Sequence, residues 1–253
     1  MGAKTALLAF VDGDLRPALL GAVPAARAEA RQAVRRIHPG YQVEWDEETT
    51  LDDTNPADDV TNVAVLAGAE IFGDRRLVLD RPSELPQHLL ALGAGRRIVM
   101  HGMHSAVDWL CFAVWEDGRL VRSLSLSPDS GIVENIGEPY AFELPYWAGE
   151  HPVDPESGWP DDDEPYPLPF HPLELGEDAL RELFGFVLEG MPEPGDVDVT
   201  DVHMHSFRVT DPTGAEQAAR EAEYARIRAA MGPPRLFRVG PDGRLHEVGL
   251  DER

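Results

Sequence analysis

Two histidines, His203 and His205, stand two residues apart in a segment, 201–209, that we expect to form a β-strand. Side chains two apart in a strand point to the same face, so both imidazoles could bind one divalent metal ion such as zinc. His101 and His104 would complete a ligand set if their strand met this one. Ordinary polar or hydrogen-bonded positions explain the same residues. We prefer that interpretation, because the spacing is common and the motif HExxH is absent.

Arg122 is the odd residue on an otherwise apolar face of an expected hairpin, where we place it opposite Ala113. A guanidinium in such surroundings needs a carboxylate or a ligand, because an unpaired buried charge is costly. If the later segment with Trp147, Glu150 and His151 lies over this hairpin, these side chains and Arg122 would line a ligand-binding pocket. A structural ion pair beneath a loop is the alternative, and the one that we prefer.

Three arginines, Arg27, Arg31 and Arg35, repeat every four residues and therefore share one face of an expected helix. In a chain this acidic, such a patch could bind a phosphate or an acidic partner. Pairing with the acidic stretch 46–59, which we expect to be a loop, explains the same arginines. Both interpretations stay open.

The elements that must position these residues include a hairpin, which we expect over residues 107–126. Its turn is Asp117-Gly118, a dipeptide typical of the type I′ turn. A two-residue turn fixes the register and would place Trp109 opposite Leu126. Apolar side chains on both faces of the first strand predict a central position in its sheet.

Other segments predict further elements. The apolar runs 5–11 and 98–103 predict strands, and helical periodicity predicts helices over 177–189 and 215–231. A short hairpin is expected over residues 236–248.

Residues 138–175 combine proline with aromatic side chains, of which they hold nine and seven. Proline blocks regular structure while aromatic rings favour burial, so we expect a long ordered strap packed on the rest of the chain. The whole pattern predicts a single α+β domain over residues 1–253. It would have a mainly antiparallel central sheet, several flanking helices and this strap.

Composition limits the classes of function. A net charge of −24 repels phosphate backbones and anionic lipids, so we expect neither nucleic acid nor membrane as a partner. No apolar run approaches the ~20 residues needed to cross a bilayer, and no secretory signal is evident, so we expect a cytoplasmic location. The only lysine is Lys4, and no GxxxxGK motif occurs, which excludes a P-loop. The only cysteine, Cys111, has apolar neighbours and is predicted to be a core residue.

Several longer segments are distinctive. They are MGAKT and DGD near the start, MHSAVDWLCFAVWEDGRLVRSLSLSPDSGIVENIGEP (103–139), YWAGEHPVD (146–154), YPLPFHPLELG (166–176) and HSF (205–207). In these segments the chain resembles an uncharacterised family common in actinobacteria, a domain of unknown function. The resemblance implies a bacterial, cytoplasmic protein. It implies no activity, cofactor or site residue.

No recognised catalytic set is present, so we expect a non-enzymatic module that binds a small ligand or a protein, without a cofactor. The alternative is a metal-assisted hydrolase that uses the clustered histidines with a divalent metal such as zinc.

Overall fold

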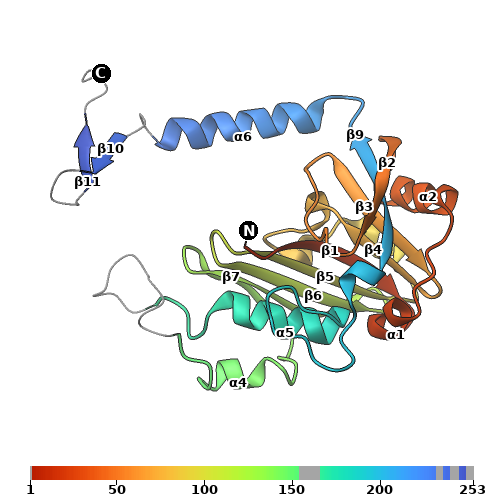
Figure 1. Ribbon diagram of the computed structural model, residues 1–253, viewed down its shortest axis with the longest axis horizontal. Helices are drawn as coiled ribbons and strands as arrows, with labels where there is room; N and C mark the ends of the chain where they lie inside the picture. The colour runs from red at the N-terminus through yellow and green to blue at the C-terminus, as the bar shows by residue number, and fades with distance from the viewer. Residues whose placement is uncertain (1, 154–165, 232–235, 240–244, 249–253) are drawn as a thin grey trace. The chain divides into compact units, whose positions relative to one another are not determined.

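The structure is a computed structural model that describes residues 2–153, 166–231, 236–239 and 245–248 (Figure 1). It divides into two compact units, residues 1–210 and 211–253. The first unit holds a nine-stranded sheet with its helices, and the second holds one helix and a hairpin. The single domain expected over 1–253 stays a prediction. The expected turn of the last hairpin and the middle of the strap, 154–165, lie outside the described residues.

The strands of the large sheet are β1 (Lys4–Val11), β2 (Gln42–Thr50), β3 (Val60–Leu66), β4 (Ala69–Gly73), β5 (Arg97–His104), β6 (Trp109–Glu116), β7 (Arg119–Ser127), β8 (Gly131–Ile136) and β9 (His203–Thr210). They lie in the order β2-β9-β3-β4-β1-β5-β6-β7-β8, and every described pair is antiparallel. The expected α+β class and antiparallel sheet are therefore confirmed.

The helices of the first unit are α1 (Leu15–Leu20), α2 (Arg27–Ile37), α3 (Gln87–Leu92), α4 (Leu144–Trp147) and α5 (Pro172–Phe184), with short 3-10 turns η1 (Arg75–Leu77), η2 (Pro82–Glu84) and η3 (Val199–Asp201). The second unit holds α6 (Ala215–Met231), β10 (Leu236–Val239) and β11 (Leu245–Val248).

Both faces of the sheet carry a hydrophobic layer. Odd-numbered side chains of β1 and β5 face a core shared with α1, α5 and the described parts of the strap. Even-numbered ones face a second core shared with α2 and α3. Figure 1 shows α5 and α2 on these two sides of the sheet. Strands β1, β5 and β6 are buried along almost their whole length, which explains their continuous apolar sequence.

Several boundaries differ from those expected. The stretch 46–59 is not all loop, because β2 continues to Thr50. The strand lies at the edge of the sheet and bulges between Trp45 and Glu48, so its acidic side chains reach water. The helix expected over 177–189 is α5, five residues earlier. Pro172 opens its first turn, and Gly185 ends it with a φ of 89°.

The expected turn is present, and the expected register holds for the pairs next to it but is wrong beyond them. Asp117 and Gly118 both have the positive φ of a type I′ turn, 50° and 74°. A bulge near Val114 then shifts β7 by one residue, so Arg122 lies opposite Val114 rather than Ala113. Beyond the bulge each β7 side chain points to the face opposite the one expected.

The strap is held to the sheet by a buried ion pair. Arg122 of β7 and Glu143 of the strap are both completely buried, and two donor–acceptor pairs at 2.9 and 2.5 Å join them. The guanidinium also donates to Asn135 at 2.6 Å and to the carbonyl of Ile136 at 3.0 Å. Glu143 accepts the backbone N–H of Tyr140 at 2.8 Å. Partners on every side are the condition for burying such charges.

Replacing Glu143 with Ala is expected to lower the free energy of unfolding by about 3–5 kcal/mol, because Arg122 would stay buried without its countercharge. Glu150→Ala is the matched control, since Glu150 is exposed in the same strap and should change stability by less than about 0.5 kcal/mol. Urea denaturation measures both variants. Equal small losses would show that the ion pair does not hold the strap.

Candidate functional site

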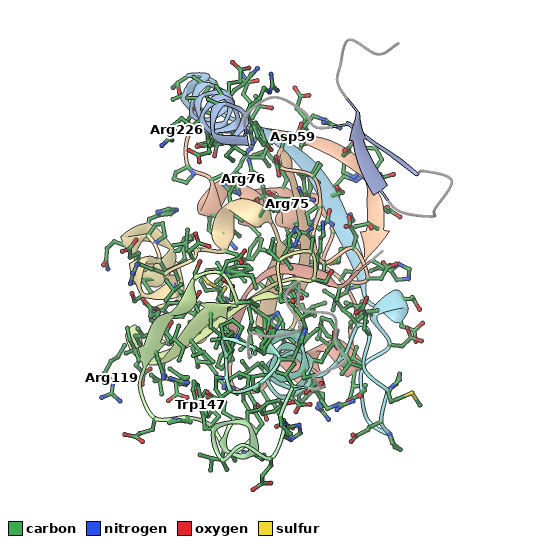
Figure 2. The ribbon with its side chains drawn as sticks, turned by 90° about the vertical axis from the view of Figure 1, so that its left-hand side faces the viewer. Asp59, Arg75, Arg76, Arg119, Trp147 and Arg226 are labelled. Carbon is green, nitrogen blue, oxygen red and sulfur yellow. The ribbon has the colours of Figure 1, made fainter. Side chains whose placement is uncertain are left out.

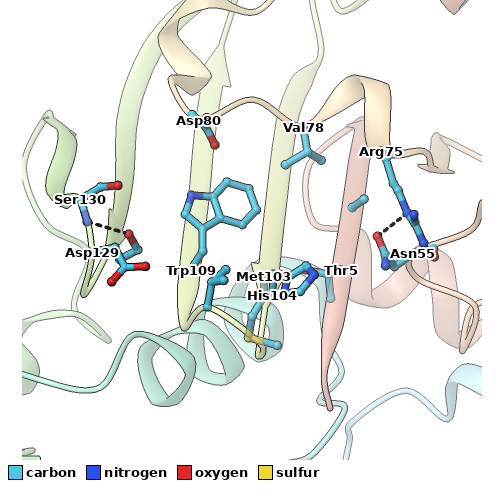
Figure 3. A pocket seen from close by; sticks show the side chains of 13 residues that line it. Thr5, Asn55, Arg75, Val78, Asp80, Met103, His104, Trp109, Asp129 and Ser130 are labelled. Atoms are coloured by element: carbon cyan, nitrogen blue, oxygen red, sulfur yellow. Dashed lines mark hydrogen bonds between the residues drawn. The ribbon is translucent and has the colours of Figure 1, made fainter. Parts of the chain in front are cut away.

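The candidate site is a pocket of about 450 Å³ at the end of the sheet where β5 leads into β6 (Figure 3). Its lining side chains come from β1, β5 and β6 with the turn between the last two, from the loop between β2 and β3, from η1 and the segment after it, and from the end of β7 and the turn that follows. The volume is within the range of small-molecule sites, about 300–1,000 Å³.

The floor of the pocket is the indole of Trp109, at the margin of the core that contains α2 and α3. The indole lies across β5 because position 102 is glycine. A Cβ there would meet Val78 Cγ1 at 2.3 Å, Trp109 Cη2 at 2.8 Å and Cys111 Sγ at 2.9 Å. Any side chain at Gly102 would therefore displace the indole or Val78, which also lines the pocket.

Two carboxylates, Asp80 and Asp129, stand around this floor (Figure 3). Both are exposed, and within the described residues neither forms an ion pair or a side-chain hydrogen bond. Asp80 follows η1, and Asp129 lies in the turn after β7. Their charges are therefore available to a ligand.

The opposite side of the pocket carries Arg75 and His104. Arg75 is already paired, with Asp58 at 2.9 Å and with the side-chain oxygen of Asn55 at 3.1 Å. Burial and the nearby positive charges of Lys4 and Arg75 lower the pKa of His104, which disfavours the protonated form of its imidazole. This side adds little free positive charge.

A buried carboxylate, Asp74, positions the segment that carries Arg75, Val78 and Asp80. It accepts the backbone N–H of Arg76 at 2.8 Å and caps η1. It also pairs with the guanidinium of Arg76, which lies beside Arg75 (Figure 2), and with Nε2 of His38 at 2.8 Å. Burial alone would raise the pKa of Asp74, but hydrogen bonds from His38 and Arg76 lower it to about 2.

The four histidines considered as metal ligands do not form one set. His101 and His104 lie on β5, and three strands separate β5 from the β9 of His203 and His205. At about 4.8 Å per strand, the two pairs are on the order of 19 Å apart. The condition for a joint set, that the two strands meet, is therefore not fulfilled in the described sheet. Among the described residues no group of three or more His, Cys, Asp and Glu could hold a metal ion.

His101 has a structural position on the α5 side of the sheet. It is completely buried, and Nε2 lies 2.9 Å from the carbonyl of Gly176 while Nδ1 lies 2.7 Å from the hydroxyl of Thr5. Nε2 must donate to the carbonyl, so Nδ1 accepts from Thr5. Burial, offset only in part by the hydrogen bond to Gly176, lowers the pKa of His101 to about 4.

His203 and His205 line a second pocket, of about 580 Å³, together with Arg27. They share the α2 face of β9, as their spacing predicts. Nε2 of His205 lies 3.2 Å from the carbonyl of Ala25. Arg27 lies 4.0 Å above the ring of Trp45 and 3.6 Å from Glu48, so much of its charge is already used within the chain.

The other two arginines of the helical patch differ in their surroundings. Arg31 lies 5.9 Å above the ring of Phe207, and Arg35 is exposed. Of the two explanations for the patch, pairing within the chain accounts for Arg27, whose partner Glu48 falls in the acidic stretch. Arg35 stays available to a partner.

The four residues expected to line a pocket near the strap have separate surroundings. Arg122 is buried with Glu143, to which Nε1 of Trp147 donates at 3.5 Å. Trp147 packs against Phe170, on the other side of the sheet from Arg75 and Arg76 (Figure 2). The ring of His151 stacks on Tyr146 at 4.1 Å, and Glu150 is exposed. The geometry gives Arg122 the structural ion pair, with a carboxylate that the sequence had not suggested.

Sequence patterns did not indicate Asp80 and Asp129 as site residues, because isolated acids beside prolines are typical of turns. One signal was available. Gly102 interrupts an apolar strand, and a glycine inside a strand marks a close approach by another group. That group is the indole of Trp109.

Fold and site together define an α+β protein with one large antiparallel sheet, two covering layers and a ligand-sized pocket at the sheet's end. The chain belongs to the family of unknown function DUF6928, whose model matches residues 5–207. The match confirms that the chain is a member of a family of unknown function, as its segments indicated. The matched range nearly coincides with the first compact unit.

No curated protein and no solved structure matched the chain in these comparisons. Within the described residues, the helices are too short or too polar to cross a lipid bilayer.

The buried His101 predicts a pH dependence of stability. Its folded pKa of about 4 lies below the unfolded value of 6.5, so the unfolded chain takes up a proton first as the pH falls. Stability from this residue is complete above about pH 6.5 and is lost toward pH 4, by roughly 3 kcal/mol over the 2.5-unit difference.

The comparison that isolates this effect is between the native chain and His101→Gln, because other titrating groups cancel in the difference. Denaturant unfolding at pH 7 and pH 4 should show the native chain losing roughly 3 kcal/mol more than the variant. A difference that stays constant with pH would contradict the assigned burial.

Proposed function

We propose that the protein is a non-enzymatic module that binds a small molecule in the pocket over Trp109. The observation that carries the proposal is the combination of an apolar floor with carboxylates that have no partner in the described residues. Small-molecule sites combine apolar walls with a few polar groups that orient the ligand. The pocket over Trp109 has both parts.

A binding role is favoured over catalysis by the state of the most reactive groups. Cys111 lies close to Gly102, as the tip of the indole does, and is completely buried; burial raises the pKa of its thiol well above the usual value. A thiol in that state is a poor nucleophile. The imidazole of His101 faces the other layer, where both its nitrogens have partners.

Two other expected roles have less support. A protein partner at Arg27, Arg31 and Arg35 would have to compete with Trp45 and Glu48 for Arg27. A hydrolase with a metal on His203 and His205 would need further ligands, and the two histidines of β5 lie too far away. Both stay predictions.

The proposed setting is the cytoplasm of a bacterium, as the resemblance implied, with no nucleic acid or membrane as partner. The net charge of −24 supports the exclusion of nucleic acid.

A fragment screen by saturation-transfer NMR tests the proposal. It should contain cationic, neutral and anionic small molecules. We expect some fragments to bind the native chain. The same fragments should not bind Trp109→Ala, because this variant lacks the indole that forms the floor of the pocket. Trp45→Ala is the matched control, because Trp45 lies on the edge strand β2 and outside the pocket. The Trp45→Ala variant should still bind all these fragments.

A second variant guards against misfolding of Trp109→Ala. Ser130→Trp places a large ring at an exposed position that lines the pocket, so it should block binding while the thermal midpoint stays near that of the native chain. If no fragment binds the native chain, or if Trp109→Ala and Ser130→Trp bind every fragment that the native chain binds, this pocket is not a ligand site.

A further inference from the structure

The pocket over Trp109 has an imbalance of charge. Asp80 and Asp129 are exposed carboxylates, and within the described residues neither has an ion-pair partner. The one guanidinium of the lining, on Arg75, is held by Asp58, which is not part of the lining. A ligand therefore meets an excess of negative charge, and the net charge of −24 adds to it over longer range.

The floor between these carboxylates is an aromatic face. Figure 3 shows the indole of Trp109 with Asp80 on one side and Asp129 on another. Among the aromatic side chains, indole attracts cations most strongly, because its π-system carries negative charge on the face. Val78 and Val107 add apolar surface to the same pocket. The carboxylates and the aromatic face both favour a positively charged group, and the apolar surface favours a ligand that also has a carbon skeleton.

We propose that the ligand of this pocket is a small organic cation, an amine or quaternary ammonium compound, held by Asp80, Asp129 and Trp109. This inference rests on the proposed function, because it assumes that the pocket binds a ligand. The ammonium group lies over the indole and between the two carboxylates, while its carbon skeleton covers Val78 and Val107.

A bare metal ion does not fit the same site. Calcium and magnesium require about six oxygen ligands that converge on one point. The described residues contain no group of three His, Cys, Asp and Glu in such an arrangement. An anion does not fit either, since it would face two free carboxylates and one guanidinium that is already paired.

Three probes of similar size separate these charge classes. They are phenethylammonium, 2-phenylethanol and 3-phenylpropionate, which are cationic, neutral and anionic at pH 7. Calorimetric titration into the native chain should give affinity about tenfold higher for the cation than for the alcohol, the sum expected of a cation–π contact and two exposed ion pairs. The anion should bind more weakly than the alcohol. Raising the salt from 0.05 to 0.5 M should narrow the difference.

Variants identify the groups responsible. Asp80→Asn with Asp129→Asn should bring phenethylammonium to within about twofold of 2-phenylethanol, because the contribution of the ion pairs is removed. The charge-matched control is Glu116→Gln with Asp117→Asn, at the far end of β6. It changes the net charge equally and should keep the preference for the cation. Thermal unfolding checks that both double variants fold.

The outcomes distinguish the two proposals. If the three probes bind equally and Asp80→Asn with Asp129→Asn changes nothing, the pocket binds ligands but has no preference for cations, and this inference is wrong. If the control variant lost the preference for the cation equally, the preference would come from the net charge of the whole protein and not from Asp80 and Asp129. That result would also overturn this inference. If no probe binds and the fragment screen finds nothing, the proposed function itself is wrong.

Discussion

The burial of β1, β5 and β6 on both faces is the constraint on which the rest of this unit depends. Strands in that position expose almost no side chain to water, so the chain must build a hydrophobic layer on each side. Helices α1 and α5 with the strap form one layer, and α2 with α3 forms the other. The second layer ends at Trp109 and Val78, which pack against its core but are only partly buried. The pocket lies where that layer stops, so it follows from how the sheet is covered.

A buried charge network connects this pocket with the far part of the same layer. Asp74 holds η1 through Arg76, and Arg76 also donates to the carbonyl of Val209 at the end of β9. His38, at the end of α2, completes the set. The low pKa of Asp74, about 2, means that the carboxylate stays charged at any physiological pH. The rim that carries Asp80 is therefore fixed by a buried carboxylate and its charged partners, and so a polar rim can be held in place beside an apolar floor.

The sequence predicted the class of fold better than the site, and the hairpin shows why. Its turn was identified from two residues, because their positive φ values are a local property. The bulge near Val114 is not local, and it moved every later side chain of β7 to the other face. Trp109 was placed opposite Leu126, but Leu126 lies opposite Leu110, and Ser127 lines the pocket with Trp109. The order of the strands in the sheet could not be predicted either. The spacing put His203 and His205 on one face, but nothing in it indicates that three strands lie between β9 and β5.

The charges of the interior and those of the pocket differ in whether they have partners within the chain. In the interior, Arg122 and Asp74 each have several partners, as buried charges must. At the pocket, Asp80 and Asp129 have none in the described residues, which costs nothing because water solvates them. Free surface acids are common, so their lack of partners alone would carry no argument. They border an indole that Gly102 admits to the sheet surface, and an exposed apolar face in water is unfavourable. A cationic ligand with an apolar part would cover the exposed face of the indole and would also pair with the two carboxylates.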